Sequence, residues 1–378
     1  MSAKTVGFDL LIRGGRVIDP ATRLDATRDV GVRGGIIVEI AERLDGPATV
    51  LVDAKGMLVT PGLIDLHVHV YHGATFWGVR PDDIGRAGGT TTVLDAGSAG
   101  SQSYRGFKEF IVDRSKVRVL GLVNLSSIGL IARSGELLDP ERADVEGAVE
   151  AIRELPKVFI GAKIRNGAHI VGQGEQGRRH SRMAVEVAER TGTFLMTHIS
   201  TPPIPMDEWL AMLRPGDIVT HCFRSGENNL FDERDRLIPS ALEARERGVL
   251  FDLGHGAGSF QLARARSALD SGFHPDTIST DLHVASVNGP VYDMTTTMAK
   301  ILDLGMPLAE VIRRSTWEPA TSIGMEDQLG SLQPGREADI AVLRLSEEPV
   351  TYSDSHGTTW QGRYKLRAER TIRAGEIL

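Results

Sequence analysis

Between residues 59 and 325, short apolar runs alternate regularly with amphipathic segments. The amphipathic segments have the period of helices and cover 106–116, 141–154, 178–190, 233–247 and 260–271. Eight apolar runs have the length of buried strands, at 63–70, 91–98, 117–126, 158–166, 193–200, 217–223, 249–256 and 277–283. Repeated strand–helix units build a parallel sheet, and eight of them in about 250 residues are typical of a barrel. We therefore predict an α/β fold with a (β/α)8 TIM barrel.

Both ends of the chain have a different pattern. Residues 1–58 contain short β-type segments separated by glycines, and residues 326–378 return to this pattern after a last helix predicted at about 307–315. Because isolated hairpins are marginally stable in water, the simplest arrangement is one composite β-sandwich built from both ends. The predicted domains are thus a β-sandwich of residues 1–58 and 326–378 and a barrel of residues 59–325.

Charge and cysteine content narrow the class of partner. The net charge of −7, without a run of Lys or Arg, does not indicate the positively charged surface that binds nucleic acid or an anionic membrane. Cys222 is the only cysteine, which excludes a disulfide framework and a cysteine-based zinc site. No apolar stretch has the length of a transmembrane helix or the pattern of a signal peptide. We expect a cytoplasmic protein with a small-molecule partner, and homo-oligomers are possible.

Two histidines near the end of the first predicted strand are candidate metal ligands. His67 and His69 are two residues apart, so both imidazoles lie on one face of the strand, which in a barrel is the interior. Neutral imidazole is the commonest metal ligand in proteins. Taken alone, the pair is equally well explained as two satisfied polar residues at a strand end.

Other ionisable side chains recur near the ends of later predicted strands. The carboxyl ends of all strands meet at the mouth of a barrel, so these side chains converge there. Burying them together is costly unless a metal ion or mutual pairing compensates the charges. The pattern therefore predicts a metal site, with His67, His69, Lys163, His198, His221 and Asp281 as its candidates.

Six motifs occur in order along the chain: PGLIDLHVH, GAKIRNG, FLMTHIS, IVTHCF, TISTDLH and GSLQPGREADIAVL. Together they resemble the amidohydrolase superfamily of metal-dependent hydrolases, in particular its dihydroorotase-like deacetylase branch. The resemblance spans nearly the whole chain. It implies a barrel with a flanking β-sandwich and a binuclear metal centre, usually zinc.

The resemblance also implies a role for each candidate ligand. His67, His69 and Asp281 would hold the buried ion, and His198 and His221 the more exposed one. Lys163 would bridge both ions as a carbamate, whereas the residue by itself is equally compatible with an ion pair to Asp281 or a snorkelling side chain. Two cations sharing one water supply hydroxide, and Asp281 is the candidate to accept and return its proton. The expected reaction is hydrolysis of an ester or amide.

Candidate substrate-binding residues lie further out at the mouth. Arg165 shares a strand face with Lys163, and a guanidinium there suits a substrate carboxylate, although pairing with a loop acid explains it equally well. His283 stands in the same relation to Asp281. The remaining candidates, each with a structural role as the alternative, are His255, Tyr71, His72 and Asn124.

One position separates the chain from true dihydroorotases, to which the resemblance assigns an Arg two residues after the histidine pair. Here that residue is Tyr71. We therefore expect a deacetylase acting on an acetylated 2-hydroxy acid such as acetyl-(R)-mandelate, or on an N-acyl amino acid. A dihydroorotase-like cyclic amidohydrolase is the alternative.

Weaker motifs favour other classes. Gly172, Gly174 and Gly177 form G-x-G-x-x-G, but they come several residues after the preceding strand and lack a following acidic residue for a ribose. We interpret them as a mobile loop over the barrel mouth. Ser259 lacks a nucleophile elbow, and Cys222, next to His221, should be a buried thiol facing the helices. A nucleotide-dependent oxidoreductase and a non-catalytic metal-binding barrel stay as remote alternatives.

Overall fold

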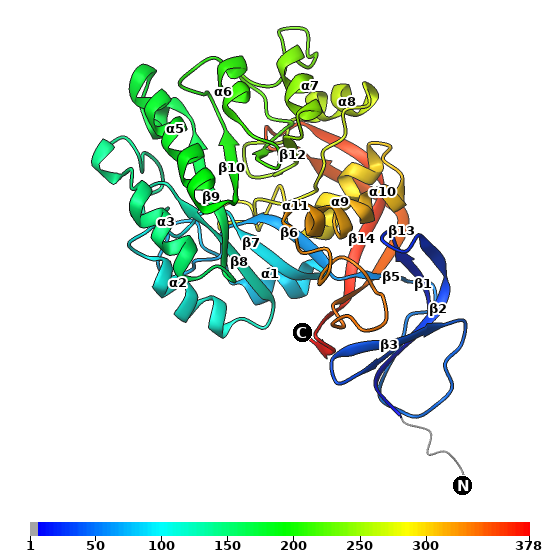
Figure 1. Cartoon of the computed structure of the whole chain (residues 1–378). Helices are drawn as coiled ribbons and strands as arrows, with labels where there is room; N and C mark the ends of the chain where they lie inside the picture. The colour runs from blue at the N-terminus through cyan, green and yellow to red at the C-terminus, as the bar shows by residue number, and fades with distance from the viewer. Residues whose placement is uncertain (1–6) are drawn as a thin grey trace.

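Seven parallel strands form the central sheet of the computed structural model, which describes residues 7–378 (Figure 1). Their order in the sheet follows their order in the sequence, so each strand pairs with its neighbour along the chain. The strands are β6 (Leu63–Val68), β7 (Thr90–Asp95), β8 (Arg118–Asn124), β9 (Phe159–Asn166), β10 (Phe194–Ile199), β11 (Ile218–Thr220) and β12 (Leu250–Asp252). All seven coincide with predicted strands.

The eighth predicted strand, at 277–283, closes the barrel with single bridges instead of a continuous ladder. Thr277 bridges Asp252 in parallel on one side, and Leu282 bridges Val68 on the other. Between them the backbone of Asp281 is left-handed, with φ +50°. Because a strand requires an extended backbone, a regular ladder cannot pass through this residue. The barrel is confirmed, with an irregular eighth segment that presents Asp281 at the mouth.

Helices surround the sheet on its outer side (Figure 1). The predicted helix at 233–247 begins only at Pro239, a residue favoured in the first turn of a helix. The helices are α1 (Pro81–Gly88), α2 (Tyr104–Phe110), α3 (Val145–Glu154), α4 (Ala168–Val171), α5 (Gly174–Thr191), α6 (Met206–Met212), α7 (Pro239–Glu246), α8 (Leu262–Asp270), α9 (Met294–Asp303), α10 (Leu308–Arg313) and α11 (Trp317–Ser322). Two 3-10 turns, η1 (Val112–Arg114) and η2 (Pro140–Arg142), lie in the connections.

The glycine motif does not form the predicted loop. Gly172 ends α4 with φ +84°, and Gly174 and Gly177 already belong to α5. A Cβ on Gly177 would lie 2.3 Å from the Cβ of Pro203, so glycine is required there for close packing. Since α4 stands between β9 and these glycines, they do not form the strand–turn–helix of a dinucleotide-binding site.

Strands from both ends of the chain form one eight-stranded sheet beside the barrel (Figure 1). β5 joins the two ends, because it pairs with β1 on one side and with β13 on the other. β5 also continues this sheet past residue 58, to Pro61. Residues 1–6, the start of the predicted first segment, lie outside the described residues. The strands are β1 (Phe8–Asp19), β2 (Leu24–Arg33), β3 (Ile36–Ala41), β4 (Ala48–Asp53), β5 (Leu58–Pro61), β13 (Ile340–Ser353), β14 (Thr359–Arg373) and β15 (Glu376–Ile377).

The hairpin of β13 and β14 also packs against the barrel. Leu343 and Leu366 belong to the same buried cluster as the barrel helices, and the indole of Trp360 donates to Asp303 at the end of α9 over 3.0 Å. The single thiol, Cys222, is fully buried, and burial raises its pKa well above the usual value. Among residues 7–378, none of the helices is long and apolar enough to cross a membrane.

Candidate active site and metal centre

The six predicted metal ligands come together at the carboxyl ends of the barrel strands. His67, Lys163 and His198 lie in β6, β9 and β10, while His69 and His221 directly follow β6 and β11. His67, His221 and Asp281 present one ligand atom each, and these atoms all lie within 4.8 Å of one another. Two imidazoles and one carboxylate this close together are a suitable donor set for a divalent transition metal.

Asp281 is the centre of one group of contacts. Its Oδ1 atom is 3.4 Å from Nε2 of His67 and 3.3 Å from Nε2 of His69. The amine of Lys163 lies 3.4 Å from Nε2 of His67. In a second group, Nε2 of His221 is 2.7 Å from Nδ1 of His198. The candidate ligands thus form two neighbouring groups, and Lys163 lies beside the group that contains Asp281.

Burial shifts the pKa values of these side chains towards the forms that bind cations. It lowers the pKa of His221 to about 3 and that of His67 well below its usual value, so both imidazoles are neutral. It also lowers the pKa of Lys163 to about 7. Burial alone would raise the pKa of Asp281, but His67, His69 and other neighbouring imidazoles outweigh it and hold the pKa well below the usual range. The carboxylate is therefore an anion among largely neutral donors.

A hydrogen-bonded relay orients His67. The hydroxyl of Thr220 donates to Oδ2 of Asp252 over 2.7 Å and lies 2.8 Å from Nδ1 of His67. Because this hydroxyl hydrogen is already engaged by Asp252, Nδ1 of His67 is the donor and its Nε2 keeps the free lone pair. Asp252 also accepts from Thr277 and Ser279, so its carboxylate is fully buried but well satisfied.

Two further buried carboxylates hold the backbone of the ligand segments. Asp65 accepts from the amide of Thr280 over 3.0 Å and from its hydroxyl over 2.6 Å, which fixes the segment that carries Asp281. Burial raises the pKa of Asp65 to about 7, although these hydrogen bonds lower it. Asp95 accepts from the amides of Val70 and Ser98 over 2.7 and 2.6 Å. Second contacts of this kind orient metal ligands and tune their basicity.

Asp65, Asp95 and Asp252 are not among the predicted site residues, although they lie in the same barrel strands as, or in strands next to, the predicted ligands. Asp65 lies two residues before His67 on the same strand, and Asp95 and Asp252 each end a barrel strand. A carboxylate at the end of an apolar strand is the signal for Asp95 and Asp252, and the strand face shared with His67 is the signal for Asp65.

Two of the candidate ligands have a left-handed backbone. His221 has φ +72° and Asp281 has φ +50°, values that are uncommon for residues other than glycine. The amide of Asp281 donates to the carbonyl of His67 over 2.7 Å, which fixes the unusual conformation. Left-handed residues cluster at functional sites because the surrounding structure must hold them there. Here the conformation turns both side chains towards the shared centre.

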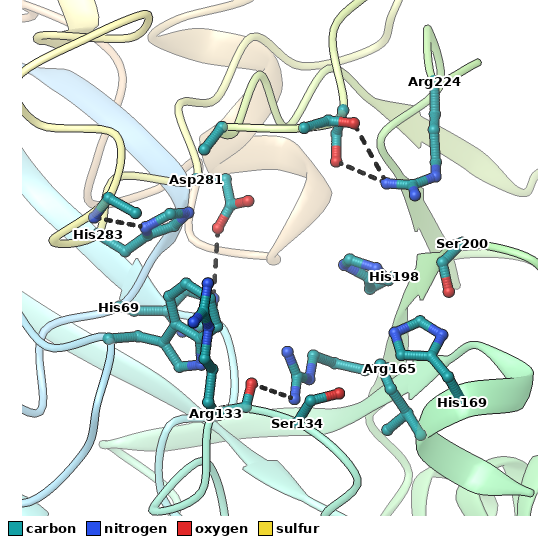
Figure 2. A pocket seen from close by; sticks show the side chains of 16 residues that line it. His69, Arg133, Ser134, Arg165, His169, His198, Ser200, Arg224, Asp281 and His283 are labelled. Atoms are coloured by element: carbon teal, nitrogen blue, oxygen red, sulfur yellow. Dashed lines mark hydrogen bonds and ion pairs between the residues drawn. The ribbon is translucent and has the colours of Figure 1, made fainter. Parts of the chain in front are cut away.

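A pocket of about 700 Å³ opens over this centre (Figure 2). His69, His198 and Asp281 lie at its wall, so the candidate ligands are accessible to a small molecule. Three guanidinium groups surround the opening, from Arg133, Arg165 and Arg224. The cationic wall is suited to an anionic ligand.

Two of the predicted substrate-binding residues line this pocket. Arg165 donates to both oxygens of Glu136 over 2.6 Å each, and Glu136 is fully buried. The alternative interpretation of Arg165, a pair with a loop acid, therefore describes its contacts in this structure. His283 also lines the pocket, with its ring centroid 4.8 Å from that of Trp77.

The other four candidates lie outside the wall of this pocket. His255 is fully buried, with its ring stacked on Phe260 and its Nε2 2.8 Å from the amine of Lys300. Tyr71 packs on Phe107 and donates to a backbone carbonyl. The side chain of Asn124 bonds the backbone of Gly97 and Ser126 as a cap, and His72 lines a separate hollow beside α1. Their contacts are those of structural residues.

The fold and the site together define a class: barrel hydrolases whose histidine and carboxylate side chains form a metal-binding centre at the carboxyl mouth. A model of the amidohydrolase family matches residues 229–371. A deacetylase of Agrobacterium fabrum is 38% identical over 311 residues, covering 82% of this chain and 76% of the relative. The chain belongs to the amidohydrolase family.

Other relatives agree with this assignment. A deacetylase of Enterococcus faecalis is 35% identical over 325 residues, covering 85% of this chain and 87% of the relative. Two solved structures superpose on almost the whole chain. One, described as an adenine deaminase, has a TM-score of 0.91 and 33% identity and covers 98% of this chain and 99% of its own. The other, described as a dihydroorotase, has a TM-score of 0.90 and 32% identity, with 98% coverage of each chain.

Proposed function

We propose that this hydrolase is a deacetylase that cleaves an acetyl ester or amide of a small molecule carrying a carboxylate. The observation that carries the proposal is the pocket, in which three guanidinium groups surround a cluster of metal-ligating side chains. The deacetylases of Agrobacterium fabrum and Enterococcus faecalis support the same reaction. An acetylated 2-hydroxy acid and an N-acetyl amino acid both combine the cleavable bond with the required anion.

We infer that the centre holds two divalent ions, most simply Zn²⁺, which accepts imidazole and carboxylate ligands. His67, His69 and Asp281 would hold one ion, and His198 and His221 the other. The contacts of Asp281 with both imidazoles and the 2.7 Å approach of the other two rings support this division. When bound, the ions would supply hydroxide at neutral pH and polarise the acyl carbonyl.

Lys163 is proposed to join the two groups as a carbamate. Because burial lowers its pKa to about 7, a substantial part of the amine is unprotonated at neutral pH. Its nitrogen lone pair would attack carbon dioxide, forming an N–C bond as one C=O electron pair moves onto oxygen and the nitrogen loses a proton. The product is an anionic oxygen ligand. Gly97 leaves room for the stem of Lys163, because a Cβ there would lie 2.6 Å from the Cβ of the lysine.

Asp281 is assigned the proton transfer. Its carboxylate is 8% exposed at the pocket and its pKa lies well below the usual range, so it is ionised at neutral pH. An ionised carboxylate accepts a proton from the attacking water and returns it to the departing alcohol or amine. The segment that carries Asp281 is held by the two hydrogen bonds that Thr280 donates to Asp65.

The second candidate is a cyclic amidohydrolase, supported by the solved structure described as a dihydroorotase. Tyr71, which stands where the resemblance implies an Arg, weighs against this reaction. Its ring is buried against Phe107 and its hydroxyl donates to the carbonyl of Ser103 over 3.2 Å, so it offers no cation to the pocket. Nothing in the described residues favours the nucleotide-dependent oxidoreductase, because Gly172 follows α4 and Gly174 and Gly177 belong to α5.

The test is metal analysis of the purified protein and of Lys163→Ala, followed by a substrate panel. We expect about two equivalents of zinc or a similar ion per chain, a sharp fall in the variant, and hydrolysis of acetylated carboxylates by the wild type. The panel includes dihydroorotate and adenine. Turnover of either one, without hydrolysis of any acetylated carboxylate, would overturn the proposal. One equivalent that is unchanged in Lys163→Ala would reduce the lysine to a structural role.

We also propose that the protein works in the cytoplasm on its small-molecule substrate. Its single thiol is free and fully buried, which is usual for proteins of a reducing compartment. Fractionation of the native cell, followed by immunodetection, tests this location.

A further inference from the structure

We propose that Arg224 is the residue that binds the substrate carboxylate. The inference rests on the proposed function and deepens it, because it assigns the anion of the substrate to one of three arginines at the pocket. The three side chains differ in their partners, their burial and their position.

Arg165 has its charge compensated by the protein. Its guanidinium makes two parallel hydrogen bonds of 2.6 Å to Glu136, which is fully buried. A bidentate pair of this kind satisfies both groups. A substrate carboxylate at Arg165 would have to compete with Glu136, whose buried charge would then lose its partner at a large cost.

Arg133 is unsuited for a different reason. Arg133 is exposed, and its guanidinium carbon lies over the ring of Phe76, 5.4 Å from the centroid. Exposed charges are screened by water and salt, so they add little affinity for an anion.

Arg224 combines burial with the absence of an acidic partner. It lies three residues after His221 and is half-buried, and burial lowers the pKa of its guanidinium. Its hydrogen bonds go only to neutral acceptors, the carbonyl of Gly258 at 3.4 Å and the hydroxyl of Ser259 at 3.2 Å. Within residues 7–378 it forms no ion pair with any carboxylate. A desolvated cation held in this way is expected to gain strongly from an anionic ligand.

The position of Arg224 also determines how the substrate lies. Figure 2 shows Arg224 on one side of the pocket and Arg133 on the opposite side, with His198 near the middle of the view. A carboxylate held by Arg224 therefore lies on the side of His198 and leaves the acyl group to extend towards Asp281. The guanidinium can bind both carboxylate oxygens, which would fix the orientation of the substrate as well as its charge.

The experiment compares Arg224→Gln with Arg133→Gln, a matched loss of one guanidinium from the same pocket. Both variants and the wild type are assayed on O-acetylmandelate and on its carboxamide, which has the same shape without the charge. We expect Arg224→Gln to lower kcat/KM for the carboxylate on the order of 10- to 100-fold, mainly through KM, and to lower it far less for the carboxamide. Arg133→Gln should change both by less than about 3-fold. Arg224→Lys should restore only part of the loss, because a lysine binds as a point charge.

A binding measurement that does not depend on turnover accompanies the assay. Mandelate and mandelamide are added to the metal-loaded proteins, and the shift in Tm is recorded. We expect mandelate to raise Tm of the wild type and of Arg133→Gln but not of Arg224→Gln, and mandelamide to have little effect on any of them. Metal content and circular dichroism of each variant show whether it is correctly folded.

The outcomes separate this inference from the proposed function. If the wild type prefers the carboxylate and Arg224→Gln keeps the same preference, the inference is wrong while the proposed function stands. An equal loss on both substrates, with lower metal content, would make Arg224 structural and also overturn the inference. If the wild type hydrolyses no acetylated carboxylate, the proposed function itself fails.

Discussion

The barrel mouth and the composite sheet both contain buried side chains, but these side chains are of opposite kinds. The core of the composite sheet is aliphatic, and its members include Leu10, Ile12, Val30, Val32 and Val342. The mouth holds buried ionisable groups instead, among them His67, Lys163, His221 and Asp281. Burying apolar groups stabilises a fold directly, whereas burying charges is costly unless partners compensate them. The sheet therefore serves stability, and the mouth is organised to bind a charge.

Two buried lysines differ in the same way, one serving stability and the other lying at the mouth. Burial lowers the pKa of both Lys163 and Lys300 to about 7. The amine of Lys300 donates to the carbonyls of Pro290 and Ser353 over 2.7 and 2.8 Å, and so links the barrel to β13. Within the described part of the chain, the amine of Lys163 has a single hydrogen-bonding contact, of 3.4 Å with Nε2 of His67. The hydrogen bonds of Lys300 are thus satisfied by the protein, whereas the amine of Lys163 can bind another group.

The largest effect is expected from Asp281→Asn, which removes the central anion of the mouth. We expect kcat for an acetylated carboxylate to fall by about 10³-fold, because the amide cannot accept the proton of the attacking water. The free energy of unfolding of the metal-free protein at neutral pH should fall, because a pKa well below the usual range means that the folded state favours the ionised carboxylate. Steady-state kinetics and urea unfolding measure the two quantities. Retained activity would show that the proton transfer belongs to another group.

Much of this mouth can be predicted from the chain, because metal ligands at strand ends recur with the period of the barrel. His67 and His69 share a strand face, and Lys163, His198 and His221 lie in or directly after later strands. The arginines behave differently. Arg224 and Arg133 lie in loops after the strands, and strand periodicity does not determine the path of a loop. The partner of Arg165, Glu136, is 29 residues away, so only the folded chain shows that its charge is compensated.

The composite sheet shows the corresponding limit for the fold. The β pattern of both ends predicts their association, but not the antiparallel pairing between β5 and β13 that joins them in one sheet. The sequence pattern at 277–283 also gives no sign that the backbone of Asp281 is left-handed. Because of this conformation, two isolated bridges stand in place of a regular eighth strand. Irregular geometry of this kind depends on tertiary contacts, here the two hydrogen bonds that Thr280 donates to Asp65.

The next effect concerns Lys300→Met, which tests whether this lysine belongs to stability alone. The substitution leaves the carbonyls of Pro290 and Ser353 without their donor, so at pH 10 the free energy of unfolding should fall by about 2–4 kcal/mol. Metal content and activity of the folded variant should be unchanged. A variant that loses metal would place Lys300 with the mouth and break the comparison.

Lys300→Met also tests how the free energy of unfolding depends on pH. Lys300 has a pKa of about 7 when folded and an ordinary value of 10.5, so between these pH values the unfolded chain binds more protons. The contribution of Lys300 to stability therefore rises with pH through this window and is smallest below pH 7, by up to about 1.4 kcal/mol per pH unit. Urea unfolding at pH 6, 8 and 10 should show a gap between wild type and Lys300→Met that widens with pH. A constant gap would contradict the shifted pKa.

A smaller effect is expected from Thr220→Val, which keeps the shape of the side chain but removes the hydroxyl between His67 and Asp252. His67 loses the acceptor that fixes its tautomer, so the affinity for metal should fall about 10- to 100-fold. Competition with a chelator of known affinity measures the change. Thr197→Val, on the neighbouring strand β10, is the matched control, because among residues 7–378 the hydroxyl of Thr197 makes one long bond, of 3.5 Å, to a backbone carbonyl. An equal loss in both variants would remove the specific role of the relay.

The smallest effect is expected in the composite sheet, from Ile12→Val. Ile12 is fully buried in the aliphatic core of this sheet, and deleting one methyl group there should lower the free energy of unfolding by about 1 kcal/mol. Because the described members of this core include none of the candidate ligands and none of the residues that line the pocket, metal content, kcat and KM should equal those of the wild type. Urea unfolding and kinetics on one preparation test both statements together. A change in metal affinity without a change in stability would mean that the sheet helps to position the mouth, and the two regions would no longer have separate roles.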